Sequence, residues 1–320
     1  MARLVVVAPN WLGDAVMALP AIADLRNALP GTAVAIVAKP AVASLFTMVP
    51  NVDEVIAKGT RLSADIGLLL PNSFRSAFDL ARAGVPQRWG YRSDGRGPLL
   101  TRAVERPAAA VHQVEYYQHL VRTLGFASGP AQPRLEITSE IRAAGARALA
   151  AAGWDGTGSL VAMAPGGAYG GAKRWPPEYF AALARELASD GFRTVIVGTA
   201  ADERTRGEIA SALGPDSASH IDVVGRTDVP ALAGVLSHVR VLVANDSGVV
   251  HLAAALGVAT ATLFGPTDER LTAPRSTAAQ AVLTHSVWCR PCMLRECPLE
   301  HRCMRGISAA AAAAAARQML

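Results

Sequence analysis

The sequence has 320 residues, of which 51% are hydrophobic, 18% charged and 5% aromatic, and its formal net charge is +5. The length predicts about two domains of roughly 150 residues each, or one large barrel, and the composition excludes a disordered, solvating protein. The scarcity of aromatic residues argues against nucleic-acid binding by base stacking, and no nucleic-acid partner is expected. The small positive excess suits an anionic partner such as a phosphate, a nucleotide or an acidic membrane surface.

No part of the sequence predicts membrane insertion or export. No apolar run reaches the roughly 18 residues of a spanning helix, and the alanine tract Ser308 to Ala316 is a helix former that is too weakly apolar to span. The N-terminus runs directly into a strand pattern, without the charged region, apolar region and cleavage site of a signal peptide. We therefore expect a cytoplasmic protein.

Strands and helices alternate along the first half of the chain. The amphipathic stretch from Asp14 to Leu29 predicts a helix, with a kink or a fresh first turn at Pro20. Short β-branched runs predict strands at Leu4 to Ala8, Ala33 to Ala38, Val52 to Ile56 and Ile66 to Leu70. This rhythm predicts a parallel sheet wound by right-handed crossovers.

The pattern loosens between Asn72 and Arg106, where seven arginines face only three acidic residues and leave a net charge of +4. The seven are Arg75, Arg82, Arg88, Arg92, Arg96, Arg102 and Arg106. One interpretation is a solvated loop and helix face. The other is a docking surface for an anionic acceptor, because the arginine fork fits phosphate and carboxylate groups.

The second half repeats the alternation more regularly. After helices at Val111 to Leu124 and Ser139 to Ala152, the segment Gly153 to Gly158 is the best candidate linker. Strands are then predicted at Leu160 to Ala164, Arg193 to Val197, Ile221 to Val224, Val239 to Ala244 and Thr260 to Phe264. With the helices between them they fit one doubly wound domain. We predict domains over residues 1–155 and 156–320, with ligands at the carboxyl ends of both sheets.

The loop after the first strand, Asn10 to Asp14, sets a carboxylate beside the first turn of the following helix. Asp14 either caps this helix, which is worth about 1 kcal/mol, or acts as a general base. An unperturbed aspartate has a pKa of about 4. It is therefore ionised at cellular pH and can accept a proton from a hydroxyl group in the transition state.

A glycine-rich loop follows the first strand of the second half. The segment Pro165 to Pro176 contains four glycines, which let a backbone approach a ligand closely, and the adjacent cations Lys173 and Arg174. The loop matches neither the P-loop nor the dinucleotide-binding fingerprint. Glycine combined with paired cations after a strand nevertheless indicates diphosphate binding.

A second candidate anion site begins at Asn245 and turns directly into an apolar helix. Asp246 or Ser247 caps this helix, and the free N–H groups of its first turn form an anion site. His251 lies about one turn further on, where it can face the same ligand, although a lone histidine is more often a packed structural residue. Thr267 and Asp268 are candidates for a sugar contact, although turn chemistry alone also explains this loop.

Five segments together resemble a known family. They are NWLGDAVMALP (Asn10 to Pro20), PGGAYGGAKRWP (Pro165 to Pro176), NDSGVVHLAAALG (Asn245 to Gly257), FGPTDERLTAP (Phe264 to Pro274) and CRPCMLRECPLEHRCM (Cys289 to Met304). In this order, and over almost the whole chain, they resemble the ADP-heptose:lipopolysaccharide heptosyltransferases, glycosyltransferase family 9. The cysteine-rich segment and the AYGGAKRWP loop are more similar to type II members, lipopolysaccharide heptosyltransferase II, than to type I members.

The resemblance implies a GT-B fold, in which two Rossmann-like domains face a central cleft. The N-terminal domain would bind the acceptor and the C-terminal domain ADP-heptose, and the C-terminal helix is a candidate to pack back on the N-terminal domain. The implied reaction is an inverting transfer of L-glycero-D-manno-heptose from ADP-heptose to the inner-core heptose of a lipid A-linked oligosaccharide. The implied location is peripheral, on the anionic inner leaflet of the cytoplasmic membrane. The alternatives are heptosyltransferase I, another GT-B enzyme with a different sugar nucleotide, and a nucleotide-binding module without catalysis.

The resemblance also implies roles for individual residues. Asp14 matches the catalytic base, and Lys173 matches a cation at the donor diphosphate. Lys173, Arg174 and the helix N-terminus at Gly248 can together replace a divalent metal, so no cofactor is expected for catalysis. The expected donor contacts are Gly166, Gly167, Ala168, Tyr169, Lys173, Arg174, Asp202, Glu203, Thr227, Asp246, Ser247, Gly248 and His251. The expected acceptor contacts are Asn10, Trp11, Gly13, Arg88 and Arg92.

All four cysteines, Cys289, Cys292, Cys297 and Cys303, lie within 15 residues, with His301 among them. In a reducing compartment this clustering indicates a metal site or a constrained loop rather than a disulfide framework. A structural zinc ion would use the four thiolates, or three of them with the imidazole of His301. Packed or redox-sensitive thiols are the alternative, and the sequence predicts no oligomeric state.

Overall fold

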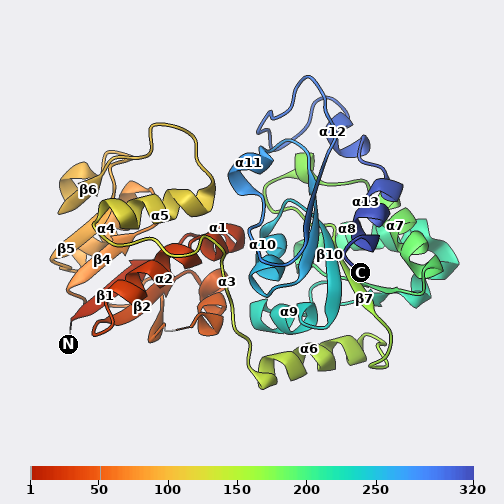
Figure 1. Cartoon of the computed structure of the whole chain (residues 1–320), viewed down its shortest axis with the longest axis horizontal. Coiled ribbons are helices and arrows are strands. Elements are labelled where there is room, and N and C mark those ends of the chain that lie inside the picture. Colours follow the sequence, from red (N-terminus) through yellow and green to blue (C-terminus); the bar gives the residue numbers. More distant parts are fainter. Residues whose placement is uncertain (1, 51) are drawn as a thin grey trace. The chain divides into compact units, whose positions relative to one another are not determined.

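The computed structural model describes residues 2–50 and 52–320 (Figure 1). The chain divides into two compact units, Met1–Glu136 and Ile137–Leu320. Each unit has one six-stranded sheet, and the described strand pairings in both are parallel. The expected pair of doubly wound α/β domains is therefore confirmed.

The sheet of the first unit has the strand order β3-β2-β1-β4-β5-β6. Its strands are β1 Arg3–Val7, β2 Ala33–Ala38, β3 Glu54–Ala57, β4 Ile66–Leu69, β5 Gln87–Tyr91 and β6 Arg102–Val104. Leu4 to Val7 are at most 5% exposed, as expected for a strand with helices on both faces. The order reverses between β1 and β4, and ligands of doubly wound sheets bind beyond the carboxyl ends of the strands at such a reversal.

The helices of the first unit follow the predicted alternation. They are α1 Leu12–Met17, α2 Leu19–Ala28, α3 Pro40–Ala43, α4 Phe74–Arg82 and α5 Gln113–Thr123, with the 3₁₀ turns η1 Ser44–Met48 and η2 Gly97–Leu99. Pro20 lies in the first turn of α2, so the fresh first turn predicted there is confirmed. A proline fits that position because the N–H groups of a first turn have no partner within the helix.

The segment between Asn72 and Arg106 is more regular than its sequence pattern predicts. It contains α4, β5 and the edge strand β6, and these strands continue the sheet beyond β4. β6 is only three residues long and begins with the exposed Arg102, so it lacks a continuous apolar run.

The second sheet has the order β12-β11-β10-β7-β8-β9, which reverses between β7 and β10. Its strands are β7 Leu160–Ala164, β8 Arg193–Ile196, β9 Ile221–Asp222, β10 Val239–Asn245, β11 Ala259–Phe264 and β12 Gln280–Thr284. The sequence predicts five of these and misses β12. The residues of this strand alternate between exposed and half-buried, so the apolar signal is weak.

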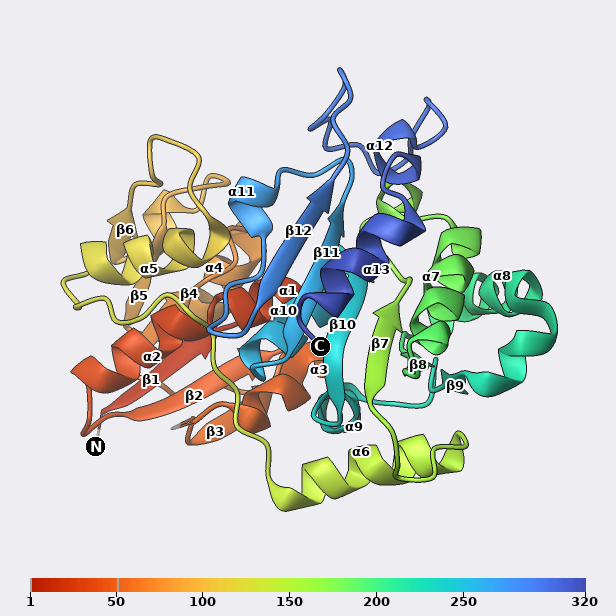
Figure 2. The ribbon, with the colours of Figure 1, turned by 45° about the vertical axis from the view of Figure 1, so that its right-hand side comes forward.

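The helices of the second unit lie on both faces of its sheet (Figure 2). They are α6 Ser139–Ala151, α7 Pro177–Ser189, α8 Glu203–Leu213, α9 Val229–Leu236, α10 Gly248–Ala255, α11 Glu269–Thr272, α12 Arg302–Arg305 and α13 Ala309–Arg317, with 3₁₀ turns η3 Gly171–Lys173, η4 Ala200–Asp202 and η5 Gly214–Ser219. None of the described helices has both the length and the apolar character that crossing a bilayer requires.

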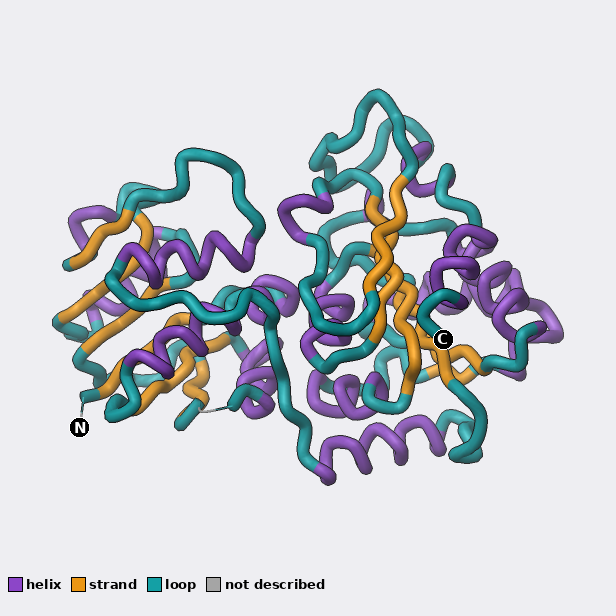
Figure 3. The backbone as a smooth tube through the Cα atoms, viewed as in Figure 1, coloured by secondary structure: helices purple, strands orange, loops and turns teal. Residues whose placement is uncertain are grey.

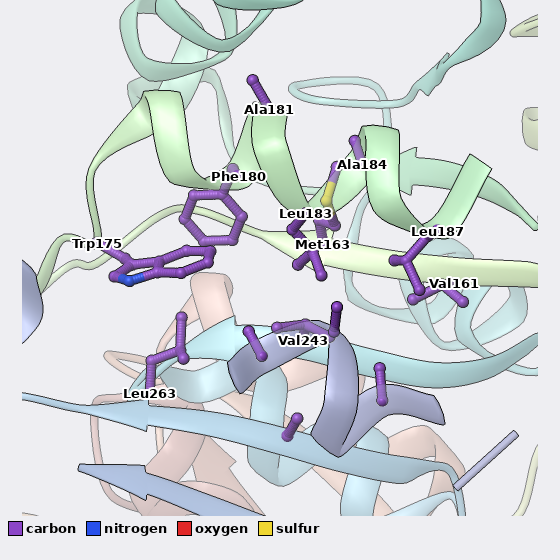
Figure 4. Close-up of a cluster of buried hydrophobic side chains, with 14 of the residues drawn as sticks. Val161, Met163, Trp175, Phe180, Ala181, Leu183, Ala184, Leu187, Val243 and Leu263 are labelled. Atoms are coloured by element: carbon purple, nitrogen blue, oxygen red, sulfur yellow. The ribbon is translucent and has the colours of Figure 1, made fainter. Parts of the chain in front are cut away.

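The main core of the second unit lies between the sheet, α7 and α13 (Figure 4). The fully buried Trp175 ring meets Phe180 edge-on, with 4.8 Å between centroids. Ala312 and Ala316 are also fully buried, because their small side chains let α13 lie close to the sheet. The C-terminal helix therefore packs on its own unit, and the expectation that it packs back on the N-terminal domain stays a prediction.

The division between the units precedes α6 rather than following it. α6 packs on α9, where a Cβ added to Gly145 would collide with the backbone of Gly234 and Val235. The expected linker Gly153 to Gly158 consequently lies inside the second unit, between α6 and β7. The division expected after residue 155 depended on glycine content, whereas the observed one follows from this long-range helix contact.

Candidate functional site

A buried ion pair joins two loops at the reversal point of the second sheet. Lys173 lies in the glycine-rich loop after β7, and Asp246 directly follows β10. Lys173 Nζ donates a hydrogen bond to Asp246 Oδ2 at 2.6 Å, and the two side chains are only 13% and 6% exposed. Because ligands of doubly wound sheets bind beyond this reversal, the pair marks the candidate ligand site of the second unit.

Further side chains fix the positions of these two charges. The Thr267 hydroxyl, in the loop after β11, donates to the same Asp246 oxygen at 2.7 Å. Lys173 Nζ also lies 4.8 Å from the ring centroid of Tyr169, which follows the exposed Ala168. Loops from three neighbouring strands therefore meet at one carboxylate, and Thr267 does more than form a turn.

Asn245 and Trp175 anchor the glycine-rich loop to the sheet. Asn245 Nδ2 donates to the carbonyls of Pro165 and Gly166 at 2.7 and 3.3 Å, and its Oδ1 accepts from the Trp175 N–H at 3.1 Å. The Trp175 indole N–H donates to the Ile307 carbonyl at 2.8 Å. Neither anchor is predicted from the sequence. The available signal was a polar residue at the end of an otherwise apolar strand.

Polar atoms without partners lie beside both members of the ion pair in the chain. Arg174 Nε and Ser247 Oγ are buried and have no hydrogen-bond partner among the described residues. Ser247 is the N-cap of α10, yet its side chain makes no capping bond, and α10 begins at Gly248. Since buried polar groups are nearly always satisfied, this arrangement is typical of a site that a polar ligand completes. The first-turn N–H groups of α10 suit an anion.

At two glycines of the glycine-rich loop, the space that a side chain would need is occupied by other residues of the protein. A Cβ at Gly166 would lie 2.7 Å from the carboxylate oxygens of Asp202, and one at Gly171 would lie 2.6 Å from the Glu296 carboxylate. By contrast, a Cβ at Gly167 would have its nearest neighbours at 3.8 Å, an ordinary contact distance. The sequence interpretation, in which these glycines serve close approach to a ligand, therefore holds less well for Gly166 and Gly171.

The remaining residues expected to contact the donor lie in caps, turns and helices of the second unit. Asp202 completes a capping box, in which its Oδ2 accepts from the N–H and the hydroxyl of Thr199, both at 2.9 Å. Glu203 forms an ion pair in the first turn of α8. Thr227 lies in the turn between β9 and α9. His251 is 5% exposed within α10, so it is a buried residue of that helix.

In the first unit, Asp14 lies in the first turn of α1, just beyond the reversal point of the sheet. Trp11 rather than Asp14 occupies the N-cap position, and Gly13 lies between them in the chain. Burial raises the pKa of the Tyr117 phenol well above its ordinary value, and the nearby carboxylate charge of Asp14 raises it further. Trp11 is 61% exposed and Asn10 is also exposed. This loop therefore presents a half-buried carboxylate and an exposed indole.

The two arginines expected to bind the acceptor differ in how far their side chains are exposed and hydrogen-bonded to the protein. Arg92 has a side chain that is 63% exposed and pairs with Glu105 at 3.2 Å. Arg88 instead donates from Nε to the Leu99 carbonyl and from Nη1 to the Val85 carbonyl, each at 2.6 Å. Arg88 therefore ties backbone segments together, and Arg92 is the better placed of the two for an external partner.

Arg96 is fully buried, so its inclusion in an external docking surface is wrong. Its Nε donates to the Tyr91 carbonyl at 2.9 Å, and its Nη1 donates to the Pro71 carbonyl at 2.5 Å and to Ser76 Oγ at 3.2 Å. Burial lowers the pKa of Arg96 to about 10. The residue fixes the loop after β4, the neighbour of the Asp14 loop across the sheet reversal.

Comparison with known proteins shows the family to which the chain belongs. The model of glycosyltransferase family 9 (heptosyltransferase) matches residues 57–302. This chain belongs to glycosyltransferase family 9. The GT-B fold implied by the sequence is therefore confirmed as well.

The relatives of this family 9 chain include type II enzymes. Lipopolysaccharide heptosyltransferase 2 of Salmonella typhimurium is 28% identical over 306 residues, which cover 88% of this chain and 87% of the relative. The protein of the same name from Escherichia coli K12 is 28% identical over 308 residues, with the same shares covered. A solved structure of E. coli ADP-heptose lps heptosyltransferase II superposes with a TM-score of 0.86 at 26% identity, covering 99% of this chain and 98% of that one.

The cysteine-rich segment of the family 9 chain has no regular secondary structure between β12 and α12 (Figure 3). Cys289, Cys292 and Cys297 are half-buried free thiols, and Cys303 is buried in α12. Burial raises the pKa of the Cys303 thiol, and the three neighbouring cysteines raise it further. Within residues 2–50 and 52–320, no group of three or more His, Cys, Asp or Glu side chains is placed to hold a metal ion. The zinc site considered for these cysteines and His301 is therefore not found.

Replacing Asp246 with asparagine should strongly destabilise the second unit. The substitution leaves the Lys173 charge buried without its partner, which typically costs about 3–5 kcal/mol. Urea unfolding should show this loss, and the double variant Asp246→Asn with Lys173→Met should be more stable than Asp246→Asn alone. Glu208→Gln is the control, because it removes one half of the exposed Arg204–Glu208 pair and should cost less than about 1 kcal/mol. Equal stability of Asp246→Asn and Glu208→Gln would contradict the role given to the buried pair.

Proposed function

We propose that this family 9 chain transfers L-glycero-D-manno-heptose from ADP-heptose to the inner-core heptose of a lipid A-linked oligosaccharide, with inversion and without a catalytic metal. The observation that carries the proposal is the buried Lys173–Asp246 pair, flanked in the chain by the unpartnered Arg174 Nε and Ser247 Oγ. The names of the type II relatives supply the sugar, the nucleotide and the lipopolysaccharide acceptor.

On this proposal the second unit binds the donor. The Lys173 ammonium group has three N–H donors and gives one to Asp246, so two remain for diphosphate oxygens. The Arg174 guanidinium and the N-terminus of α10 at Gly248 add positive charge to the same site. As the bond to the sugar breaks, these groups stabilise the growing negative charge on ADP, the task that a divalent cation performs in other transferases.

On the same proposal the first unit binds the acceptor, and Asp14 is the general base. The acceptor hydroxyl oxygen forms a bond to the anomeric carbon on the face opposite ADP, while the bond from that carbon to the phosphate oxygen breaks. The hydroxyl proton passes to the Asp14 carboxylate, and ADP leaves with the bonding electron pair. Attack from the opposite face inverts the anomeric centre. Contacts from Asn10, Trp11 and Arg92 would hold the acceptor sugar and its anionic groups.

A peripheral membrane contact also belongs to the proposal, and the structure changes the residues that are suited to it. Arg96 is buried and Arg88 donates to backbone carbonyls, so neither serves an external surface. The exposed face of α4 instead carries Phe74 and Phe78, which are 46% and 43% exposed and stacked at 6.3 Å. Arg75 and Arg82, on the same helix, are exposed as well. Aromatic rings beside arginines suit the interface of an anionic bilayer.

Asp14→Ala should lower kcat by about 10²-fold or more, because it removes the proton acceptor in the transition state. The measurement is steady-state turnover of ADP-heptose with a one-heptose acceptor. ADP binding to this variant, measured by calorimetry, should stay close to wild type, since Asp14 lies in the other unit from the donor loops. Turnover close to wild type would remove Asp14 from the mechanism.

Product analysis with defined acceptors tests the proposed reaction itself. The reaction mixture contains ADP-heptose and enough chelator to bind all trace metal. Under these conditions the chain should extend the one-heptose acceptor and leave the heptose-free acceptor unchanged. The new linkage should have the anomeric configuration opposite to that of the donor. Transfer to the heptose-free acceptor alone would indicate a type I enzyme, and activity that requires added magnesium would overturn the metal-free mechanism.

The α4 surface predicts salt-sensitive binding to vesicles that contain anionic phospholipid. Arg75→Glu combined with Arg82→Glu should reduce cosedimentation with these vesicles by reversing the charge of that face. Arg204→Glu is the matched control, because Arg204 is 88% exposed in the second unit, far along the chain from α4. Equal vesicle binding by the α4 variant and the control would exclude this surface.

A further inference from the structure

A segment that the proposed mechanism leaves unused lies beside the donor loops. Residues 289–296, here called the strap, belong to the cysteine-rich segment between β12 and α12. The strap forms hydrogen bonds with two separate loops of the proposed donor site, the loop after β11 and the glycine-rich loop after β7. No metal or disulfide is needed for these bonds, which involve arginine, glutamate and backbone groups.

Arg290 attaches the strap to the loop after β11. Its side chain is only 12% exposed, its Nε donates to the Gly265 carbonyl at 2.7 Å, and its Nη2 donates to the Thr267 carbonyl at 3.3 Å. Nη2 also pairs at 2.5 Å with a carboxylate of α11. The Met293 N–H donates to the Pro266 carbonyl at 2.9 Å. These bonds fix the backbone from which the Thr267 hydroxyl reaches the donor-site carboxylate.

Met293 and Arg295 attach the strap to the glycine-rich loop. The Met293 carbonyl accepts from the Tyr169 hydroxyl at 2.7 Å, and the Arg295 carbonyl accepts from the Ala172 N–H at 2.9 Å. The Arg295 guanidinium lies 5.3 Å from the Tyr169 ring, the ring that Lys173 Nζ also contacts. These bonds hold the loop at Tyr169 and at Ala172, just before the position of its lysine.

The fit between strap and loop is close enough to require glycine. At Gly170, which has φ +155°, a Cβ would meet the backbone of Arg295. At Gly171 it would meet the carboxylate of Glu296, whose Oε1 accepts from the Gly171 N–H at 3.1 Å. Two of the glycines in the donor loop are therefore shaped to the strap.

The geometry points to the strap as a positioning element of the donor site, with Arg290 as its principal positioning residue. The contacts form a closed circuit from Arg290 to Thr267, then through Asp246 and Lys173 to Tyr169, which bonds back to the strap. Weakening the strap frees both loops that hold the ion pair. The inference rests on the proposed donor site, and it assigns the strap to nucleotide binding rather than to acceptor binding or proton transfer.

Arg290→Lys tests this role, because lysine keeps the charge but cannot reach two carbonyls with a planar fork. Loss of one charge-assisted hydrogen bond predicts about a tenfold weaker Kd for ADP by calorimetry and a similar rise in KM for ADP-heptose. KM for the acceptor should stay unchanged. Arg270→Lys is the matched control, since Arg270 lies in α11, directly after the loop that follows β11, with an 80% exposed side chain and should leave ADP binding unchanged.

A second variant keeps the test decisive if Arg290→Lys folds poorly. Arg295→Ala retains the strap backbone bonds but removes the cation on the Tyr169 ring, and ADP binding should weaken about two- to fivefold. Lys173→Ala is the reference for the donor site. If Lys173→Ala loses ADP affinity while Arg290→Lys and Arg295→Ala do not, the strap proposal is wrong. If Lys173→Ala binds ADP normally, the donor-site assignment itself fails, and the strap proposal fails with it.

Discussion

The second unit is organised around the contact between Lys173 and Asp246, two opposite charges 2.6 Å apart and almost out of water. Either charge alone would be costly to bury, so the loops that carry them are stable only while they are held together. The strand order brings the two loops together, because β7 and β10 are neighbours at the sheet reversal. Asn245, Trp175 and Thr267 then fix the two loops and the carboxylate, and these contacts shape the candidate ligand site.

Much of this arrangement is predictable from sequence because it follows from local patterns and from the rules of parallel sheets. Buried parallel strands are continuous apolar runs, and the residues after them must lie at one edge of the sheet. That reasoning brings Lys173 and Asp246 to the same edge without a structure. The edge strands β6 and β12 are not predicted because they are short or half-exposed, and β5 is not predicted because its sequence, QRWGY, contains no β-branched residue. The same reasoning also misplaces the domain division, since the contact of Gly145 with Gly234 joins helices far apart in sequence.

Individual roles were harder to predict than the location of the site, because a role depends on what a side chain contacts. Asp202 has the expected residue type after β8, yet its carboxylate completes a capping box and packs on Gly166. His251 has the expected spacing but is buried in α10. Gly171 is glycine because Glu296, which is 125 residues further along the chain, occupies the space of a side chain. No local pattern contains such information.

The arginines show why net charge is a poor guide to the charge available to a partner. Three arginine side chains, those of Arg88, Arg96 and Arg290, donate hydrogen bonds to backbone carbonyls, which carry no formal charge. These guanidinium groups therefore stabilise loops and are less accessible to an external partner. Arginine suits this use because it keeps its proton when buried and offers several donors in one plane. The positive excess of the sequence therefore has two parts. One part holds loops of the fold in place, and only the other, which includes the exposed Arg75 and Arg92, is available to an external anionic partner.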